Sequence, residues 1–337
     1  MSLSRPAFWS KRSLPGFLLW PVSLIFSFIV FLRRTVYRAG VLSSWRSPVP
    51  VVVIGNITVG GAGKTPLVIA FSELLTKREY RIGIVTRGYG GVANETPVVA
   101  TADSDPAIVG DESVLLASRT ELPVVVSANR AEAIRHLLAN FNIDCVLCDD
   151  GLQHYALQRD LEIAVIDSEY LFGNRFCLPA GPLRESIKRL DSVDMKVYSG
   201  NNRTVPDKLP GYSLVGSNLV SVNDSANVVS IESFAGKRVH AVAGIASPAN
   251  FFEFLRAKNI DVVPHGFADH AKYQHSDLLF NDDLPVVMTE KDKVKCSRFN
   301  KKNCWYIPVK AELDYSITEE FITHVERVFS MRKSNAD

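Results

Sequence analysis

A short glycine-rich run constrains the fold of this chain more than any other feature. Residues 59–65 have the sequence Val-Gly-Gly-Ala-Gly-Lys-Thr and are separated by three residues from an apolar run, residues 49–55, that is typical of a buried strand. A helical pattern starts at about Lys64 and continues to about Lys77. Glycines let the backbone wrap around a phosphate group, so that several N–H groups point at it. The strand, turn and helix therefore predict a P-loop and an α/β domain of the P-loop NTPase type.

The residues of this loop indicate how it would hold a nucleotide. Lys64 would place its charge at the β and γ phosphates of ATP, and the Thr65 hydroxyl would bind Mg²⁺. One position departs from the G-x-x-x-x-G-K-[ST] pattern, because Thr58 stands where glycine is usual. The core of the motif is intact, so we expect ATP and Mg²⁺ as cofactors. The predicted nucleotide-binding residues are Thr58, Val59, Gly60, Gly61, Ala62, Gly63, Lys64 and Thr65.

The pattern after the loop predicts two α/β domains. Short apolar runs alternate with helical stretches, which favours a mostly parallel sheet covered on both faces. These runs are residues 82–86, 124–127, 143–148, 161–167 and 195–199.

The chain then changes character before a second domain begins. Residues 201–230 are rich in Asn, Ser and Gly and contain two short alternating runs, 212–215 and 219–222, which predict a β-hairpin or hinge. A new strand–turn–helix pattern starts at Val239. The expected organisation is an N-terminal helix at 1–38, a P-loop domain at 39–205, a hinge at 206–230 and a smaller α/β domain at 231–337.

The N-terminal segment has the features of a membrane-associating helix. Residues 14–32 carry no charge and lie between Lys11, Arg12 and the basic group Arg33, Arg34 and Arg38. A helix of that extent is about 28 Å long, close to the thickness of a bilayer core. Pro21 interrupts the run. Three interpretations remain open: a membrane span, a monotopic helix in one leaflet, and a helix buried in the protein.

Charge is unevenly distributed along the chain. The first acidic residue is Glu73, so the N-terminal segment is basic and the remainder is net acidic, although the whole chain carries a formal charge of +2. A basic, apolar N-terminus on an acidic body favours an anionic membrane surface over nucleic acid as a partner. No obligate protein partner is inferred.

Several carboxylates are candidates for the phosphate and metal chemistry. Asp149 and Asp150 follow the strand-like run 143–148, where a P-loop domain draws a further contact to Mg²⁺, and we assign that contact to Asp149. A simple Asp-Asp-Gly turn is the alternative. Gln153 and His154 lie just beyond and are expected to face the same cleft.

A candidate general base lies at the start of another helix. Asp111 precedes a probable helix at 113–118, where it is either an N-cap or a base that takes the proton of an acceptor hydroxyl. His270 lies in a loop-like stretch of the second domain. It would matter for catalysis if domain closure brought it to Asp111, where the two side chains would share a proton. Arg87 and Arg184 follow strands and are candidates for binding phosphate, with ordinary surface arginines as the alternative.

Seven ordered motifs together resemble one enzyme family. They are residues 55–66, Gly-Asn-Ile-Thr-Val-Gly-Gly-Ala-Gly-Lys-Thr-Pro; 87–90, Arg-Gly-Tyr-Gly; 109–112, Val-Gly-Asp-Glu; 149–154, Asp-Asp-Gly-Leu-Gln-His; 181–185, Gly-Pro-Leu-Arg-Glu; 267–270, Phe-Ala-Asp-His; and 288–292, Met-Thr-Glu-Lys-Asp. This set closely resembles the tetraacyldisaccharide 4′-kinases, the lipid A kinases of Gram-negative bacteria, over essentially the whole chain.

The resemblance implies a substrate and a location that composition cannot name. It implies transfer of the ATP γ-phosphate to the 4′-hydroxyl of a tetraacyldisaccharide 1-phosphate, making lipid IV-A at the cytoplasmic face of the inner membrane. It also implies that Asp111 is the base and that His270 is its partner. The remaining candidates for substrate or phosphate contacts are Arg87, Glu112, Asp150, Gln153, His154, Arg184 and Glu185.

Two other functions fit parts of the pattern. A membrane-anchored P-loop ATPase or GTPase switch would need no second domain carrying a histidine, and residues 289–292 match the Asn-Lys-x-Asp guanine motif only in part. A non-catalytic membrane scaffold would not need Lys64, Thr65 and Asp149 together. Nucleotide turnover with and without a glycolipid acceptor distinguishes these functions from a kinase.

Overall fold

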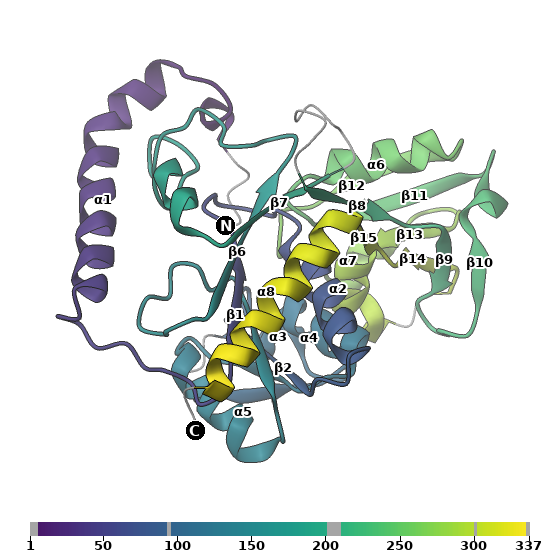
Figure 1. The fold of residues 1–337 in the computed structure, drawn as a ribbon. Helices are drawn as coiled ribbons and strands as arrows, with labels where there is room; N and C mark the ends of the chain where they lie inside the picture. The colour runs from purple at the N-terminus through teal and green to yellow at the C-terminus, as the bar shows by residue number, and fades with distance from the viewer. Residues whose placement is uncertain (1–5, 93–95, 201–209, 300–301, 335–337) are drawn as a thin grey trace.

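The computed structural model describes residues 6–92, 96–200, 210–299 and 302–334. Figure 1 shows the elements in two parts, one around β1 and one around β11, with α1 set apart at one side. The α-helices are α1 Leu14–Arg38, α2 Lys64–Thr76, α3 Pro106–Val109, α4 Asp111–Thr120, α5 Arg130–Asn140, α6 Pro248–Ala257, α7 Glu290–Cys296 and α8 Tyr315–Ser334. Short 3₁₀ helices lie at Ala7–Trp9, Ile187–Ser192, Ile231–Phe234, His275–Leu278 and Ser297–Phe299.

The first sheet has nine strands within the described residues, in the order β15-β8-β7-β6-β1-β5-β2-β4-β3. All neighbours pair in parallel except at the two edges, where β15 and β3 are antiparallel. The mostly parallel sheet predicted from the sequence is confirmed. Its strands are β1 Val51–Gly55, β2 Ile82–Thr86, β3 Val98–Ala100, β4 Val124–Val126, β5 Cys145–Asp149, β6 Leu161–Asp167, β7 Met195–Ser199, β8 Gly211–Val215 and β15 Lys310–Leu313.

The order of these strands places the P-loop at the centre of the sheet. β1 lies between β5 and β6, and the strand order reverses there, with β5, β2 and β4 on one side and β6, β7 and β8 on the other. In open parallel sheets, ligands bind beyond the carboxyl ends of the strands at such a reversal. The glycine-rich loop follows β1 at this point and leads into α2.

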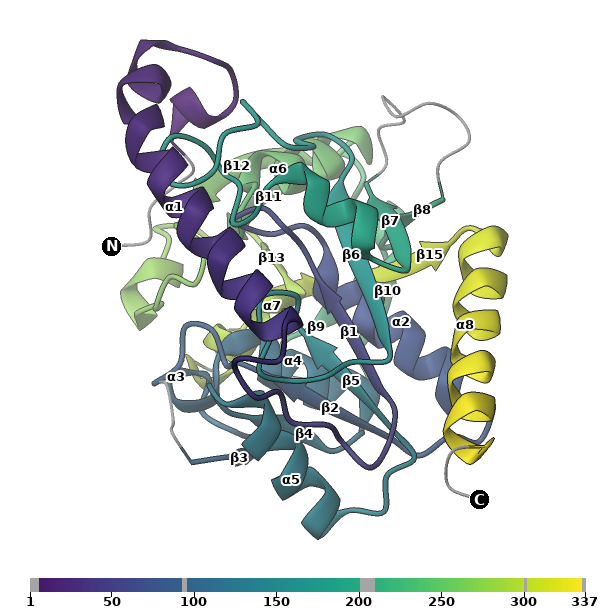
Figure 2. The same cartoon turned by 60° about the vertical axis from the view of Figure 1, so that its left-hand side comes forward.

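Helices cover both faces of the first sheet. α2, α4 and α8 contribute to one apolar core, in which the rings of Phe71 and Phe321 stack with centroids 3.8 Å apart. α5 and the segment around Leu183 and Leu190 contribute to the core on the other face, against which Phe26 of α1 also packs. In Figure 2, α1 and α8 accordingly lie on different sides of the sheet.

The second sheet has six strands among the described residues, in the order β10-β9-β14-β13-β11-β12. β14, β13, β11 and β12 are parallel, and the hairpin β9–β10 adds antiparallel strands at one edge. A second, smaller α/β unit is therefore present. Its strands are β9 Asn218–Ser221, β10 Val228–Ser230, β11 Arg238–Ala243, β12 Asp261–Gly266, β13 Val286–Thr289 and β14 Cys304–Ile307.

The connection between the sheets differs from the predicted hairpin. Residues 212–215 and 219–222 do not pair with each other, because β8 pairs with β7 and β15 in the first sheet whereas β9 pairs with β10 and β14 in the second. The chain passes from one sheet to the other at Gly216 and Ser217. Closeness in sequence suggested a local pairing, but each strand has a partner from elsewhere in the chain. The predicted boundary between residues 205 and 206 lies outside the described residues.

The C-terminal segment also corrects a predicted boundary. β15 pairs with β8 at the edge of the first sheet, and α8 packs on α2 in the first core. The assignment of all of 231–337 to the smaller domain is therefore wrong for β15 and α8. Position in the sequence suggested a single domain, but strand pairing and core packing place β15 and α8 with the first sheet.

α1 lies on the outside of the molecule, with most of its apolar side chains exposed. Leu14, Leu18 and Phe31 are 72%, 71% and 64% exposed. The Ser23 hydroxyl donates a hydrogen bond to the Cys177 carbonyl at 2.7 Å and holds the helix to the body. Within the described residues, one helix, α1, is long and apolar enough to cross a membrane. Its exposure argues against the interpretation as a helix buried in the protein.

Candidate active site

The P-loop is held in shape by contacts from β7, β8 and the segment at 181–185. The Ser199 hydroxyl donates to the Ala62 carbonyl at 2.7 Å, and the Tyr212 hydroxyl donates to the Gly63 carbonyl at 2.5 Å. Gly63 has a φ of 80°, and a Cβ atom there would lie 2.5 Å from the Tyr212 hydroxyl. Only glycine fits this position, because a side chain would be both strained and in collision. The glycine spacing of the motif therefore has a direct structural cause.

Lys64 begins α2 and extends back over the loop. Its Nζ donates to the Asn56 amide oxygen at 3.3 Å and lies 3.6 Å from an Asp150 carboxylate oxygen. Asn56 is fully buried, and its amide also donates to the Thr58 hydroxyl at 3.2 Å. Thr58, which replaces the usual glycine, is thus accommodated by a hydrogen bond. Asn56 was not among the predicted site residues, although it lies within the quoted motif 55–66.

Two aspartates at the end of β5, Asp149 in the strand and Asp150 just after it, have opposite surroundings. Asp149 is 1% exposed, and neither carboxylate oxygen has a hydrogen-bond partner within the described residues. Burial raises the pKa of Asp149 to about 7, and the charges of Glu112 and Asp150 act in the same direction. Asp150, with a φ of 49°, accepts two hydrogen bonds of 3.0 Å from Arg184. Burial acts to raise the pKa of Asp150 as well, but the charges of Lys64 and Arg184 outweigh it and hold that pKa far below its usual range.

Three other predicted residues, Gln153, His154 and Arg87, differ in whether they contact the P-loop. Gln153 faces the loop, since its amide donates to the Asn56 carbonyl at 3.1 Å. Burial, followed by the charges of Arg130 and Arg159, lowers the pKa of His154 to about 4. Arg87 is exposed and makes no hydrogen bond or ion pair within the part of the chain that the structure describes.

Two arginines and a glutamate complete this side of the site. The buried Arg130, at the start of α5, donates to the Asp149 backbone carbonyl at 3.0 Å and was missed from the sequence. Glu185 accepts a hydrogen bond of 2.5 Å from Tyr155 and pairs with Arg189 at 3.2 Å. The carboxylate of Glu185 is thus used by these two residues. These contacts favour a structural role for Glu185 over direct contact with phosphate.

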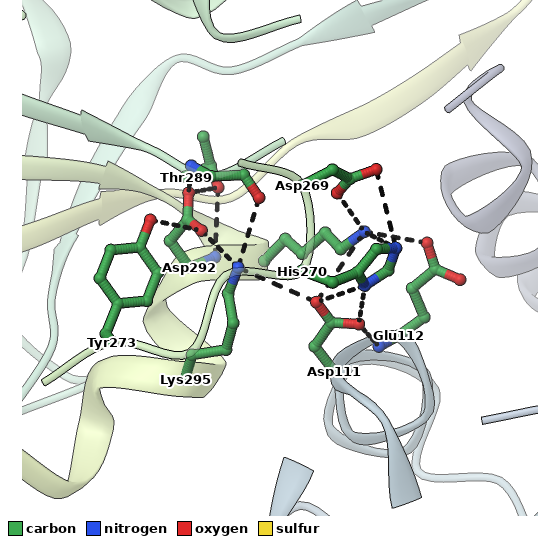
Figure 3. Close-up of polar contacts among 10 residues, drawn as sticks. Asp111, Glu112, Asp269, His270, Tyr273, Thr289, Asp292 and Lys295 are labelled. Carbon is green, nitrogen blue, oxygen red and sulfur yellow. Dashed lines mark hydrogen bonds and ion pairs between the residues drawn. The ribbon is translucent and has the colours of Figure 1, made fainter. Parts of the chain in front are cut away.

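A second polar cluster joins the two domains. Asp111 is the first residue of α4 and is 4% exposed. His270 comes from the second domain, and its Nδ1 lies 3.0 Å from both carboxylate oxygens of Asp111 (Figure 3). The position before the helix belongs to Gly110, so Asp111 is not the N-cap. The sequence suggested that domain closure is required for this contact, but the contact is present in the structure.

Two lysines of α7 complete this cluster and were not predicted. Lys291 Nζ lies 3.1 Å from a Glu112 oxygen, 3.1 Å from an Asp269 oxygen and 3.3 Å from His270 Nε2. Lys295 Nζ lies 2.7 Å from an Asp292 oxygen and 3.9 Å from an Asp111 oxygen. Lys291 is part of the quoted Met-Thr-Glu-Lys-Asp motif, which was the available signal.

These contacts determine the charge of Asp111. Burial alone would raise the pKa of Asp111, but the hydrogen bond with His270 and the charge of Lys291 lower it overall. The carboxylate is therefore ionised at neutral pH. The adjacent Glu112 connects the two clusters, because its charge contributes to the raised pKa of Asp149.

A small cavity of about 60 Å³ lies beside the Asp111–His270 pair. It is lined by Gly90, Asp105, Pro106, Ala107, Asp111, His270, Ala271, Lys272, Tyr273, Lys295 and Arg298. A bidentate pair at 2.8 Å between Arg119 of α4 and Glu290 of α7 holds the domains together next to the cluster.

Comparison with known proteins identifies the family. A family model described as tetraacyldisaccharide-1-P 4′-kinase matches residues 16–327. This chain belongs to that family. Proteins named tetraacyldisaccharide 4′-kinase are similar to it: that of Hahella chejuensis is 43% identical over 330 residues, covering 96% of this chain and 97% of its own. That of Azoarcus sp. is 44% identical over 326 residues, covering 95% of each chain.

A solved structure supports the same grouping for the fold. It is described as the "apo" form of LpxK from Aquifex aeolicus in complex with ATP. The two folds match with a TM-score of 0.77 at 26% identity, over 93% of this chain and 99% of that one. The resemblance drawn from the seven motifs and the predicted P-loop α/β fold with a second α/β unit are thereby confirmed.

Proposed function

We propose that this tetraacyldisaccharide 4′-kinase family member transfers the γ-phosphate of ATP to the 4′-hydroxyl of a tetraacyldisaccharide 1-phosphate. The product is lipid IV-A, an intermediate of lipid A biosynthesis. Family membership and the names of its relatives support the reaction. The structural observation that carries it is the contact of Asp111 with His270 beside the P-loop domain's nucleotide site. A simple nucleotide switch has no use for such a pair from two domains.

The geometry supports a direct role for Asp111. The acceptor hydroxyl oxygen attacks the γ-phosphorus and forms a new O–P bond, while the bond from that phosphorus to the β–γ bridging oxygen breaks and ADP leaves. The hydroxyl proton passes to a carboxylate oxygen of Asp111, which is ionised at neutral pH. His270 holds that carboxylate in place through its ring Nδ1.

The loop at 58–65 forms the nucleotide site in this proposal. The similar Aquifex aeolicus protein is described in complex with ATP, which supports ATP as the nucleotide here. Lys64 would leave its contacts with Asn56 and Asp150 to meet the β and γ phosphates, since both contacts are longer than 3.2 Å. Arg184, which holds Asp150, lies where it can add a second positive charge.

The residues also fit a magnesium ion. Asp149 is a buried carboxylate without a hydrogen-bond partner among the described residues, which is costly unless a cation compensates it. Thr65 lies at the start of α2 and is nearly buried. We assign Mg²⁺ to Thr65 and Asp149, where the ion would neutralise phosphate charge during transfer.

We further propose that the protein works at the cytoplasmic face of the inner membrane, with α1 in contact with lipid. The exposed apolar side chains of α1 and the flanking Arg33, Arg34 and Arg38 support this placement. Such a helix contributes both apolar burial and attraction to anionic headgroups. The acceptor's acyl chains would then remain in the membrane while its sugar reaches Asp111.

The test is phosphate transfer by the purified full-length protein in detergent micelles. With tetraacyldisaccharide 1-phosphate and Mg·ATP, we expect a product carrying one additional phosphate at the 4′ position and little ATP hydrolysis without the acceptor. Rapid ATP hydrolysis without the acceptor, together with no phosphorylated lipid product in its presence, would favour the nucleotide switch instead. Lys64→Ala controls for contaminating kinases, because its transfer should fall by about a hundredfold or more.

A further inference from the structure

The ammonium group of Lys291 contacts the imidazole ring of His270. Its Nζ lies within hydrogen-bond distance of three groups: Glu112 Oε1, Asp269 Oδ1 and His270 Nε2, at 3.1, 3.1 and 3.3 Å. An ammonium group has three N–H donors and no acceptor. Each donor of Lys291 therefore has one partner, and His270 Nε2 is one of them.

Lys291 is charged in this environment. Burial acts to lower the pKa of Lys291, but the charges of Glu112 and Asp111 outweigh it and hold that pKa well above its usual range. The side chain is 16% exposed, so water competes little for its donors. An ammonium beside a ring nitrogen can only donate to it, which requires an unprotonated Nε2.

The remaining ring nitrogen then has a defined role. With Nε2 as acceptor, the single ring proton of neutral His270 is on Nδ1, which faces both Asp111 oxygens at 3.0 Å. The alternative places a proton on Nε2 and directs it at Asp269, whose nearer oxygen is 3.6 Å away, beyond ordinary hydrogen-bond distance. The ring of Tyr89, with its centroid 4.6 Å from that of His270, restricts rotation of the imidazole.

We propose that Lys291 is a positioning residue that fixes the Nδ1–H tautomer of His270 and so keeps the imidazole a donor to Asp111. This inference rests on the proposed function, in which Asp111 takes the hydroxyl proton. In this tautomer His270 cannot accept that proton at Nδ1, and its Nε2 is occupied by Lys291. In this arrangement Asp111 accepts the proton of the acceptor hydroxyl, and His270 orients the Asp111 carboxylate.

The tautomer can be measured directly in the full-length protein. We would label the seven histidines with ¹⁵N, record long-range ¹H–¹⁵N correlation spectra at neutral pH, and identify His270 with His270→Gln. Wild type should show a protonated Nδ1 and an unprotonated Nε2. Lys291→Met should shift the signal toward a protonated Nε2, whereas Lys291→Arg, which retains a charged donor, should keep the wild-type pattern.

A matched control comes from the same helix. Lys293 lies two residues further along α7, and its ammonium lies over the Tyr306 ring, 5.5 Å from the centroid. Lys293→Met removes the same charge without a contact to His270, so it should change neither tautomer nor turnover. For Lys291→Met we expect kcat to fall at least about tenfold with the KM for ATP nearly unchanged, because an imidazole in the wrong tautomer orients its partner poorly.

Two results would overturn the proposal: a protonated Nε2 in wild type, or an unchanged tautomer in Lys291→Met. The wild-type spectrum and Lys291→Arg decide the matter if Lys291→Met does not fold. Failure of the proposed function has a different signature, since a wild-type protein without transferase activity would still show the Nδ1–H tautomer.

Discussion

Asp111 and Asp149 are both buried carboxylates, 4% and 1% exposed, yet their surroundings shift their pKa values in opposite directions. Asp111 has His270 at hydrogen-bond distance and two lysines at 3.9 Å, and its pKa is lowered. Asp149 has no hydrogen-bond partner within the described residues, and its pKa is raised to about 7. Asp111 is therefore ionised without a bound ligand. Asp149 would need a bound cation to compensate its charge.

This difference separates the two halves of the proposed reaction. Asp111 and His270, the groups proposed to act on the acceptor hydroxyl, are already positioned by contacts between the domains before any ligand binds. The groups proposed to bind the nucleotide include Asp149, which has no hydrogen-bond partner among the described residues, and Lys64, whose contacts could be exchanged for phosphate. Preorganised charge is the larger source of catalysis in phosphoryl transfer, whereas exchangeable charge allows the nucleotide to bind and leave.

Disruption of the Asp111–His270 pair should reduce phosphate transfer the most. Asp111→Ala should reduce single-turnover transfer about 10²- to 10⁴-fold, the range for loss of a general base. If the two residues act as one unit, Asp111→Ala/His270→Ala should be little worse than Asp111→Ala alone. ATP affinity, measured by titration calorimetry, should be nearly unchanged in these two variants and in His270→Ala. Fully additive losses, or loss of ATP binding in His270→Ala, would give the histidine another role.

Removing the cation of the P-loop tests the other half of the comparison. Lys64→Ala should lower transfer by about a hundredfold or more, because the charge on the transferred phosphate is no longer stabilised. Unlike the Asp111 variants, it should also weaken ATP binding. Lys77→Ala, an exposed lysine at the other end of α2, is the control and should behave as wild type. Near-normal turnover by Lys64→Ala at saturating ATP would contradict the P-loop assignment.

Asp149 predicts a pH dependence of stability in magnesium-free protein. Its pKa in the fold is about 7, against an ordinary value of 3.8, so folding disfavours the ionised form. The stability that this group contributes at low pH is lost as the pH rises through about 7. Asp149→Asn should therefore be more stable than wild type at pH 8, by on the order of 2–4 kcal/mol, and about equal at pH 4.

Urea denaturation at the two pH values measures this difference. Mg·ATP should stabilise wild type at pH 8 far more than it stabilises Asp149→Asn, because the bound cation compensates the carboxylate only where one exists. A stability gap that does not change between the two pH values would mean that Asp149 is compensated within the protein.

Substitutions on α1 should affect the P-loop and the Asp111–His270 cluster least. Replacing two exposed side chains, Leu18→Glu and Ile25→Glu, should reduce sedimentation with anionic vesicles and transfer to a membrane-embedded acceptor. ATP affinity should not change, since neither side chain contacts the P-loop. The matched variant Leu18→Ala/Ile25→Ala should have an intermediate effect on vesicle binding. Equal vesicle binding by the glutamate variant and wild type would remove α1 from the membrane proposal.

Much of the fold could be predicted because its signals are local. The P-loop lies in seven consecutive residues after a strand, and the ranges predicted for β6 and β7 agree with the structure at both ends. Short edge strands such as β3 and β15 were missed, because a few residues without a turn signal give no periodicity. The hairpin between 212–215 and 219–222 was wrong because strand pairing depends on which edges are available in space.

The order of residues alone indicates the chemistry that each motif can perform: a loop suited to binding phosphate, a carboxylate at the end of β5, and an aspartate and a histidine in two separate domains. Which of these groups meet depends on how the chain packs. Lys291 and His270 are 21 positions apart, and Lys291 and Glu112 are 179 apart, so no local pattern joins them. Their charges act on one another because folding brings them within about 3 Å in a buried site, where electrostatic interactions are strong. The same packing left Asp149 without a hydrogen-bond partner among the described residues, which the identity of the residue alone could not reveal.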